Sequence, residues 1–286
     1  MDAIELRDGE VFLPRRRPDT HKGDYGKLLI VGGAVGYTGA PTLCARAAVR
    51  AGAGLVWLGV PAPIYEITAV KNDEAMPFPL PAEGGGVSAD AVDAVLSRLA
   101  SCDVAALGPG MGKGEGTAAV VRAVLTSGLS KPLVLDADAL NVLEPMLPLL
   151  RSYGAPVVLT PHGGEFARLG GALTGDFAAD AARFSALWGA VTVLKGHRTA
   201  VAFPSGEVYI TKHGNPGMAK GGSGDVLTGV LAAMLGQLPP ERAVCTAVHL
   251  HALAGDLCAA RLGEYAMTAT DLIETLPEAT KQIIET

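Results

Sequence analysis

The chain has 286 residues, of which 49% are apolar and only 5% aromatic, so alanine, valine, leucine and glycine must fill a sizeable core. The net charge is −6 and no lysine/arginine run exceeds Arg15-Arg16-Arg17, which argues against nucleic-acid binding because that needs a basic face. The N-terminus lacks the regions of a signal peptide and no apolar run is long enough to cross a bilayer, so we expect a cytoplasmic protein with no membrane partner.

Apolar runs alternate with helical patterns along most of the chain. Strands are predicted at 27–31, 55–60, 104–107, 133–136, 157–160 and 191–195, followed by a hairpin of 200–203 and 208–211. Helices are predicted at 40–51, 89–99, 117–126 and 177–188, and over most of 223–285, interrupted at 239–240 and 267–270. This alternation predicts an α/β fold with a mostly parallel sheet covered on both faces. Composition does not shift along the chain, so we expect a single domain over residues 1–286.

The four cysteines are Cys44, Cys102, Cys245 and Cys258. They form no CxxC pair and stand in apolar surroundings. We therefore predict buried free thiols of a reducing compartment, and neither a zinc site nor a disulfide framework.

The most informative motif is the glycine-rich stretch at 215–225, which reads NPGMAKGGSGD. Apolar residues recur after it at helical spacing, so a buried helix begins near Ser223 or Gly224. A glycine turn at a helix N-terminus offers free N–H groups and the positive end of the helix dipole to an anion, usually phosphate. Asp225 would repel that anion. It is either a base for a hydroxyl that attacks or loses a phosphoryl group, or an acid that merely stabilises the helix end.

Two further glycine loops follow strands. The loop at 32–40 resembles a dinucleotide-binding turn, but the next strand ends Leu58-Gly59-Val60-Pro61 without the acid that would bind ribose. The loop at 108–112, GPGMG, is either a plain turn or a place where a flat ligand lies on the backbone. Ligands of an open parallel sheet bind beyond the C-terminal strand ends, where all of these loops lie.

Charged side chains follow three of the predicted strands. One of Asp136 and Asp138 is expected to line the site, although both could cap a helix. Glu165, in TPHGGEFARL, could reach a metal-bound water or a phosphate-bound magnesium, or it could cap while His162 packs. The segment Lys195-Gly196-His197-Arg198-Thr199 could contact nucleotide phosphates or be an ordinary connection. The histidines at 249 and 251 face different sides of a helix, so we expect no metal pair there.

The order of these motifs resembles the ribokinase-like superfamily, and specifically the ADP/ATP-dependent NAD(P)H-hydrate dehydratases, the carbohydrate-kinase-like domain of the YjeF family. The segments HKGDYG at 21–26, VGG at 31–33 and YTGA at 37–40 are similar to the family's N-terminal signature. The segment KGGSGDVLTG at 220–229 is similar to its C-terminal one. The resemblance runs from about Pro14 to about Glu278 and implies a three-layer ribokinase-like sandwich. A histidine at 162, where many sugar kinases have asparagine, fits the bacterial dehydratases better.

The resemblance also implies which residues form the site. The substrate would contact Ala40, Gly110, His162, Glu165, Arg168 and Asp225, with Asp225 as the catalytic residue. The nucleotide would contact Lys195, Gly196, His197, Arg198, Thr199, Asn215, Met218, Lys220, Gly221, Gly222, Ser223 and Gly224. Magnesium would be held through phosphates and, by way of a water, through Glu165.

The implied reaction repairs hydrated NADH or NADPH at the expense of ADP or ATP. Phosphorylation turns the ring hydroxyl into a good leaving group, with Asp225 taking its proton and the glycine N–H groups stabilising the transferred phosphoryl. The resemblance further implies a homo-oligomer, such as a tetramer, and a separate epimerase protein. The alternatives are a small-molecule kinase for a vitamin alcohol of the hydroxyethylthiazole or pyridoxine type, and a non-catalytic nucleotide-binding protein.

Overall fold

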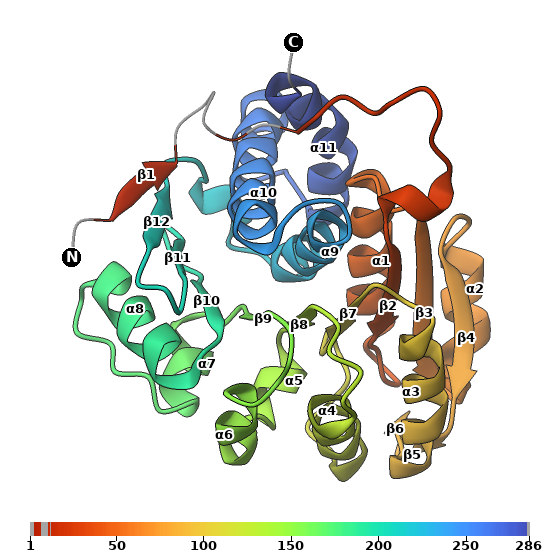
Figure 1. Cartoon of the computed structure of the whole chain (residues 1–286). Helices are drawn as coiled ribbons and strands as arrows, with labels where there is room; N and C mark the ends of the chain where they lie inside the picture. Colours follow the sequence, from red (N-terminus) through yellow and green to blue (C-terminus); the bar gives the residue numbers. More distant parts are fainter. Residues whose placement is uncertain (1–2, 7–10, 12, 285–286) are drawn as a thin grey trace.

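A ten-stranded sheet runs through the middle of the molecule (Figure 1). The structure is a computed structural model that describes residues 3–6, 11 and 13–284. In spatial order the strands are β1 (Ile4–Leu6), β12 (Val208–Thr211), β11 (Ala200–Ala202), β10 (Val191–Leu194), β9 (Val157–Leu159), β8 (Leu133–Leu135), β7 (Val104–Leu107), β2 (Lys27–Val31), β3 (Leu55–Pro61) and β4 (Met76–Leu80). The seven strands from β10 to β4 are parallel, and only β11 runs antiparallel to its neighbours. The predicted mostly parallel sheet is confirmed.

Helices cover both faces of this sheet (Figure 1). One face carries α1 (Gly39–Arg50), α9 (Ser223–Leu235), α10 (Pro240–Leu262) and α11 (Ala269–Ile283). The other carries α3 (Val92–Ala100), α4 (Glu115–Thr126), α5 (Asp138–Asn141), α6 (Leu147–Leu150), α7 (Gly163–Arg168) and α8 (Phe177–Trp188). Alternate residues of each strand serve the two faces: Leu28 and Ile30 of β2 join the first core, and Leu29 and Val31 join the second. The three-layer sandwich expected from the resemblance is therefore confirmed.

Some elements gave too weak a pattern to be predicted. Strand β4 reads MPFPL, and its prolines are tolerated because β4 is an edge strand with one neighbour only. The three-residue β1 pairs with β12, and the helix α2 (Tyr65–Lys71) packs beside β4. Gly84 and Gly85 form the turn between the short strands β5 (Ala82–Glu83) and β6 (Gly86–Val87). Residue 285, the end of the last predicted helix, lies outside the described residues.

The strand order reverses between β2 and β7. From β2 the chain proceeds through β3 to β4 in one direction, and from β7 it proceeds through β8 and β9 to β10 in the other. The loops after β2 and β7 meet at this point, where the Gly33 N–H donates to the Pro109 carbonyl at 2.8 Å. Such a switch point opens a crevice at the C-terminal strand ends, where ligands of open α/β sheets bind.

The expectation that no apolar run is long enough to cross a bilayer is corrected by α10. With 23 residues it is long and apolar enough to cross a membrane by length and composition, but 72% of its most apolar window is buried inside the protein, as in a core helix.

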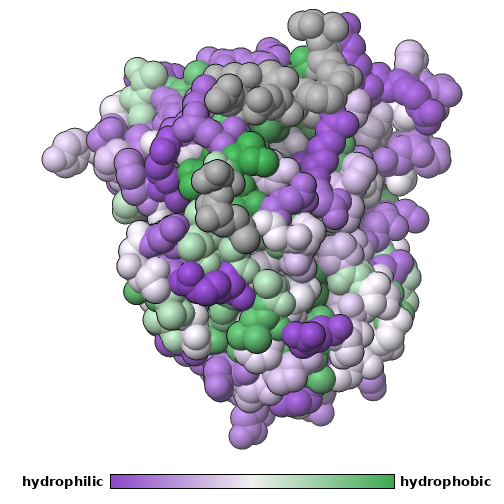
Figure 2. All heavy atoms as spheres, turned by 60° about the vertical axis from the view of Figure 1, so that its left-hand side comes forward, coloured by the Kyte–Doolittle hydropathy of each residue, from purple (hydrophilic) through white to green (hydrophobic). Residues whose placement is uncertain are grey.

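The four cysteines are free and buried, as predicted. On the face that Figure 2 shows, hydrophilic residues are interspersed with small apolar areas.

Candidate active site

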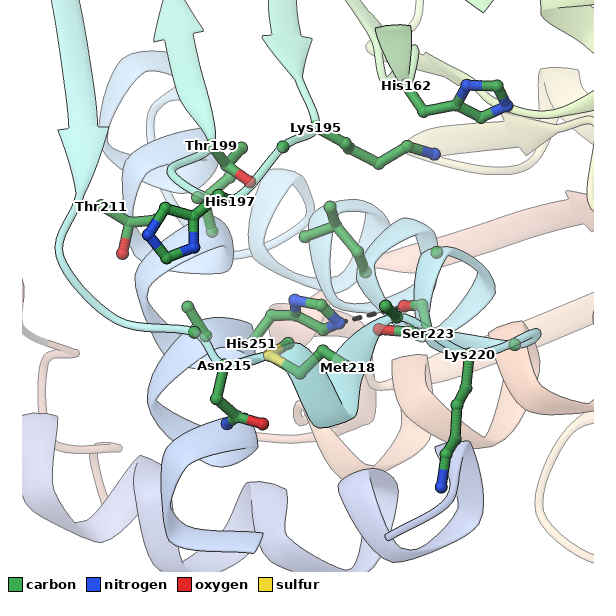
Figure 3. Close-up of a pocket in the computed structure, with 18 of the residues that line it drawn as sticks. His162, Lys195, His197, Thr199, Thr211, Asn215, Met218, Lys220, Ser223 and His251 are labelled. Carbon is green, nitrogen blue, oxygen red and sulfur yellow. Dashed lines mark hydrogen bonds between the residues drawn. The ribbon is translucent and has the colours of Figure 1, made fainter. Parts of the chain in front are cut away.

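A cavity of about 810 Å³ opens where the C-terminal strand ends meet the start of α9 (Figure 3). Its walls come from the ends of β8, β10 and β12, from the segment 213–225, which includes the short 3₁₀ helix η5 (Pro216–Met218), and from α10. The cavity collects into one place most of the motif loops that are far apart in the sequence.

The glycine turn before α9 has the conformation that an anion site needs. Gly222 adopts a left-handed φ of 97° at the N-cap, and no side chain caps the helix. A Cβ on Gly222 would lie 2.7 Å from Leu43 Cδ1 and 2.8 Å from Ala269 Cβ, so only glycine fits between α1 and α11. The first N–H groups of this 13-residue helix therefore remain available to a ligand in the cavity.

Asp225 stands in the first turn of α9 and borders the same cavity. Among the described residues none forms a hydrogen bond or ion pair with its carboxylate. Burial, and then the nearby Asp136 carboxylate, raise the pKa of Asp225 from 3.8 to about 7. A carboxylate with this pKa can both accept and return a proton near neutral pH, as a general base must.

Asp136 lies beneath that turn at the centre of a buried polar cluster. Its Oδ1 accepts hydrogen bonds from Thr160 Oγ1 at 2.7 Å and from Lys195 Nζ at 2.9 Å, and its Oδ2 accepts one from Thr228 Oγ1 at 2.7 Å. Burial alone would raise its pKa, but the ammonium and the two hydroxyls lower it below the ordinary value. Asp136 is therefore a charged group at neutral pH, and of the two candidate acids it is the one that lines the cavity.

Asp138 serves a different loop. Its carboxylate accepts hydrogen bonds from the Gly112 N–H at 2.8 Å and from Asn141 Nδ2 at 3.1 Å. The side chains of the two aspartates can point to different loops because Ala137 between them has a positive φ of 49°, which is strained for a residue with a side chain. Neither aspartate caps α5, whose N-cap is Ala137.

The helix α10 holds the loop that forms the far wall of the cavity. The Asp256 carboxylate accepts hydrogen bonds from His213 Nδ1 at 2.8 Å, from the Gly214 N–H at 3.1 Å and from Asn215 Nδ2 at 3.0 Å. One helical turn earlier, His251 is neutral because burial lowers its pKa to about 4, and its Nε2–H donates to the Ser223 carbonyl at 3.0 Å (Figure 3).

Apolar side chains make this part of the cavity suitable for a flat ring. They belong to Met218, Leu227, Val248 and Ala252. Polar loops and an apolar wall together are typical of sites that bind a small molecule with both ring and phosphate parts.

The predicted nucleotide residues mostly gather in this cavity. Its lining includes Lys195, Gly196, His197, Thr199, Asn215, Met218, Lys220, Gly221, Gly222, Ser223 and Gly224. Arg198 is not among them, since its guanidinium pairs with Glu5 on β1 at 2.9 Å. The Lys220 side chain points away from the cavity (Figure 3) and its ammonium donates to the carbonyls of Tyr265 and Met267 at 2.6 and 2.7 Å.

Of the predicted substrate residues, His162 and Asp225 line this cavity, and the other four are not part of its lining. Ala40 and Gly110 are neighbours at the switch point, where a Cβ on Gly110 would lie 3.1 Å from Ala40 Cβ. His162 lines the cavity and also caps α7: its Nδ1 accepts from the Gly164 N–H at 3.0 Å. Arg168 is exposed and donates from Nε to Asn141 Oδ1 at 3.1 Å. These placements leave the substrate roles as predictions.

Glu165 combines a structural role with its predicted metal role. Its Oε2 accepts from the His162 N–H at 2.9 Å and lies 4.0 Å from Lys195 Nζ. In the part of the chain that the structure describes, no group of three or more His, Cys, Asp or Glu side chains could hold a metal ion. Magnesium in nucleotide enzymes is usually held by one or two carboxylates together with phosphates and waters. Glu165 fits that arrangement through an intervening water.

Four residues that hold the cavity-lining groups in place were not predicted from the sequence. Thr160 and Thr228 hold Asp136, while His213 and Asp256 hold the far loop. Thr228 lies 92 positions from Asp136, and Asp256 lies 43 positions from His213. Nothing in the local pattern marks such pairs. The one available signal was that Asp136, Thr160 and Lys195 each directly follow a strand of the parallel sheet.

A mostly parallel sheet lies between two layers of helices, and a glycine turn leads into a helix at the C-terminal edge of that sheet. Together these features define a ribokinase-like α/β protein. Residues 28–278 match the Carb_kinase family model, whose description is NAD(P)H-hydrate dehydratase. The chain belongs to this family.

Curated relatives agree with this family. The chain is 46% identical to the "Bifunctional NAD(P)H-hydrate repair enzyme Nnr" of Moorella thermoacetica, over 96% of this chain but only 52% of that protein. It is 39% identical to the "ADP-dependent (S)-NAD(P)H-hydrate dehydratase" of Neisseria meningitidis, over 88% of this chain and 83% of the relative. The chain thus spans about half the length of the bifunctional relative.

Solved structures agree as well. The ADP/ATP-dependent NAD(P)H-hydrate dehydratase of Bacillus subtilis, co-crystallised with ATP/Mg²⁺, superposes with a TM-score of 0.84 at 31% identity over 99% of both chains. A hydroxyethylthiazole kinase from Pyrococcus horikoshii superposes with a TM-score of 0.58 at 17% identity, over 86% of this chain and 94% of the kinase. The second likeness shows the fold alone.

Proposed function

We propose that this chain dehydrates hydrated NADH and NADPH back to the intact cofactors in a nucleotide-dependent reaction, with ADP as the preferred nucleotide. The family membership and the names of the Neisseria and Bacillus relatives support this proposal. The observation that carries it is the Asp225 carboxylate, which faces a nucleotide-sized cavity at an uncapped helix start without any partner among the described residues.

The proposed chemistry follows from that position. As the ring hydroxyl oxygen attacks the terminal phosphoryl group of the nucleotide, Asp225 takes the hydroxyl proton, and AMP leaves if the donor is ADP. The C–O bond then breaks, inorganic phosphate departs, and the adjacent ring carbon gives a proton to water as the double bond re-forms. N–H groups at the start of α9 would stabilise the negative charge on the transferred phosphoryl.

We assign the nucleotide and the hydrated dinucleotide to separate places. The nucleotide ring would lie against Met218 and Val248, and its phosphates would lie at Gly221–Gly224. The dinucleotide would approach from Ala40, Gly110 and His162, so that Asp225 stands where the ligands meet. When bound, Mg²⁺ would neutralise phosphate charge, with Glu165 reaching it through a water.

The direct test is to supply hydrated NADH with ADP or ATP and magnesium, and to follow the recovery of NADH absorbance. We expect recovery with ADP at least as fast as with ATP. The variant Asp225→Asn should lose at least about 100-fold in kcat while it still binds ADP, because a general base typically contributes that much. Absence of recovery with either nucleotide would refute the proposal, and strong activity of Asp225→Asn would refute the role of this residue.

The rival function is phosphorylation of a vitamin alcohol by the same carboxylate and helix start. It is supported only by the shared fold. The same reaction mixtures separate the two functions: a kinase would leave a stable phosphate ester of an added thiazole or pyridoxine alcohol, whereas the dehydratase releases inorganic phosphate and NADH together.

A further inference from the structure

Two carboxylates and one ammonium share the space beneath the first turn of α9. A Cβ on Gly224 would lie 3.3 Å from Lys195 Nζ and 4.0 Å from Asp136 Oδ2, so the ammonium and the buried carboxylate both abut this turn. Asp225 follows Gly224 directly, and its pKa responds to both groups. Nevertheless the ammonium bonds to Asp136 at 2.9 Å and forms no ion pair with Asp225.

We propose that Asp136 is a positioning residue, which retains the Lys195 ammonium and thereby prevents it from forming an ion pair with the Asp225 carboxylate. The hydroxyls of Thr160 and Thr228 fix both oxygens of Asp136, so it competes for the ammonium as a pre-oriented acceptor. Asp225 has no such donors and loses that competition. The inference rests on the proposed function only for the use of Asp225 as the proton acceptor.

This arrangement matters because an ion pair would make Asp225 a weak base. An opposite charge at contact distance lowers the pKa of a carboxylate by about 1–3 units, whereas a neighbouring carboxylate raises it. With Lys195 hydrogen-bonded to Asp136, Asp225 has a buried like charge nearby, and the ammonium offsets part of that charge without forming an ion pair with Asp225. Its pKa of about 7 agrees with this geometry.

The other charged and titratable groups around Asp225 do not replace this effect. Asp138 on α5 raises the pKa of Asp225 further, but its effect is smaller than those of burial, Asp136 and Lys195. Burial, and then Asp225 and Asp136, raise the pKa of the Cys44 thiol on α1, which is therefore neutral.

Two groups on other elements bear on the same turn. His251 on α10 is neutral and bonds to the Ser223 carbonyl. Glu165 on α7 lies 4.0 Å from the Lys195 ammonium, farther than Asp136 does. Lys195 is thus the cation that lowers the pKa of Asp225, against the larger effects of burial and of Asp136.

The test measures the titration of Asp225 itself, in the full-length protein without nucleotide. Aspartate side chains are labelled with carbon-13 at the carboxyl carbon, and the Asp225 signal is identified by its loss in Asp225→Asn. We expect Asp136→Asn to lower the Asp225 midpoint by at least about one pH unit, because a like charge is lost and the ammonium is released to Asp225. Adding Lys195→Met to that variant should raise the midpoint again by a similar amount.

The matched control is Asp138→Asn, the same substitution two positions along the chain. Asp138 holds no ammonium, so its loss should move the midpoint by less than about half a unit. Lys195→Met in the otherwise unchanged protein gives an independent arm, in which the midpoint must rise because Asp136 then stands beside Asp225 without its counter-ion. If Asp136→Asn does not fold, Asp136→Ser is measured in its place.

The proposal is overturned by an unchanged or raised Asp225 midpoint in Asp136→Asn, or by an unchanged or lowered one in Lys195→Met. Loss of the Asp136 charge by itself also lowers this midpoint, so retention of the ammonium is shown when Lys195→Met raises the midpoint more in the Asp136→Asn variant than in the otherwise unchanged protein. The NMR readout does not depend on turnover, so the two hypotheses fail separately. A protein that shows the shifts but does not regenerate NADH would refute the dehydratase function and leave the inference standing.

Discussion

At the scale of single residues, Asp225 combines two opposing demands. A carboxylate that must accept a proton near neutral pH has to be partly buried and kept from cations, and the same surroundings make its charge unfavourable in the folded state. The protein therefore carries a destabilising group at the place where chemistry is proposed. Active sites commonly trade stability for activity in this way.

This trade predicts that Asp225→Asn stabilises the protein at alkaline pH. The pKa of Asp225 rises from 3.8 in the unfolded chain to about 7 in the folded protein, so between these values the folded state holds a proton that the unfolded state releases. The free energy of unfolding therefore falls as the pH rises through this window. Asparagine does not titrate, so the free energy of unfolding of the variant does not fall in this way. We expect the variant to be more stable by roughly 2 kcal/mol at pH 8, after a discount for remaining solvent exposure.

Urea unfolding of both proteins without nucleotide, at pH 8 and at pH 4, measures this difference. At pH 4 the carboxyl group is largely protonated in the folded state, so the advantage of the variant should nearly vanish. An Asp225→Asn protein that is less stable than the parent at pH 8 would contradict this account of the site.

At the scale of elements, α10 forms one wall of the cavity and also holds the loop that forms the far wall. His251 and Asp256 lie on neighbouring turns of α10, and they bond to the first turn of α9 and to the 213–215 loop. A buried helix of the core thus positions two segments that would otherwise be independent loops. In this way packing of the last helices determines the shape of the cavity.

The variant Asp256→Asn tests this role. The substitution replaces the carboxylate that accepts from His213, Gly214 and Asn215 with a neutral amide. The NH2 group of that amide would face at least one of these donors, and the hydrogen bond there would be lost. Charge-assisted hydrogen bonds contribute about 1.5–3 kcal/mol, so we expect the KM for ADP to rise at least about ten-fold while kcat changes less than about two-fold. Glu241→Gln, at the other end of the same helix, is the matched control. An unchanged KM in Asp256→Asn would show that the loop keeps its conformation without this carboxylate.

The same elements explain what could be predicted from the sequence. Six of the seven parallel strands, all but β4, and the start of α9 were predicted because apolar periodicity and glycine are local signals. The cluster around Asp136 was not, because its members come from three strand ends and α9, and only the strand order makes them neighbours. Predicted strands 133–136, 157–160 and 191–195 each ran one residue too far. Those extra residues are Asp136, Thr160 and Lys195, which lie just beyond the strand ends and form the cluster through their side chains.

At the scale of the whole molecule, the sheet separates two apolar cores. Leu231 of α9 belongs to the core beneath α1, α10 and α11, and Leu99 of α3 belongs to the core on the opposite face. Every central strand contributes side chains to both, so neither core can form without the sheet. We therefore propose that the described chain unfolds as one cooperative domain, with the ligand cavity at its edge.

The positions of the two tryptophans make this proposal testable. Trp57 and Trp188 both pack against the core that contains Leu99, so their fluorescence reports on that face only. Leu231→Ala opens a cavity in the other core and should lower the free energy of unfolding by about 2–5 kcal/mol, as should Leu99→Ala. In a single cooperative unit, Leu231→Ala must shift the tryptophan transition and the far-ultraviolet circular dichroism transition together. If it shifted the dichroism and left the fluorescence midpoint in place, the faces would unfold separately, because a signal on one side of the sheet would not sense a defect on the other.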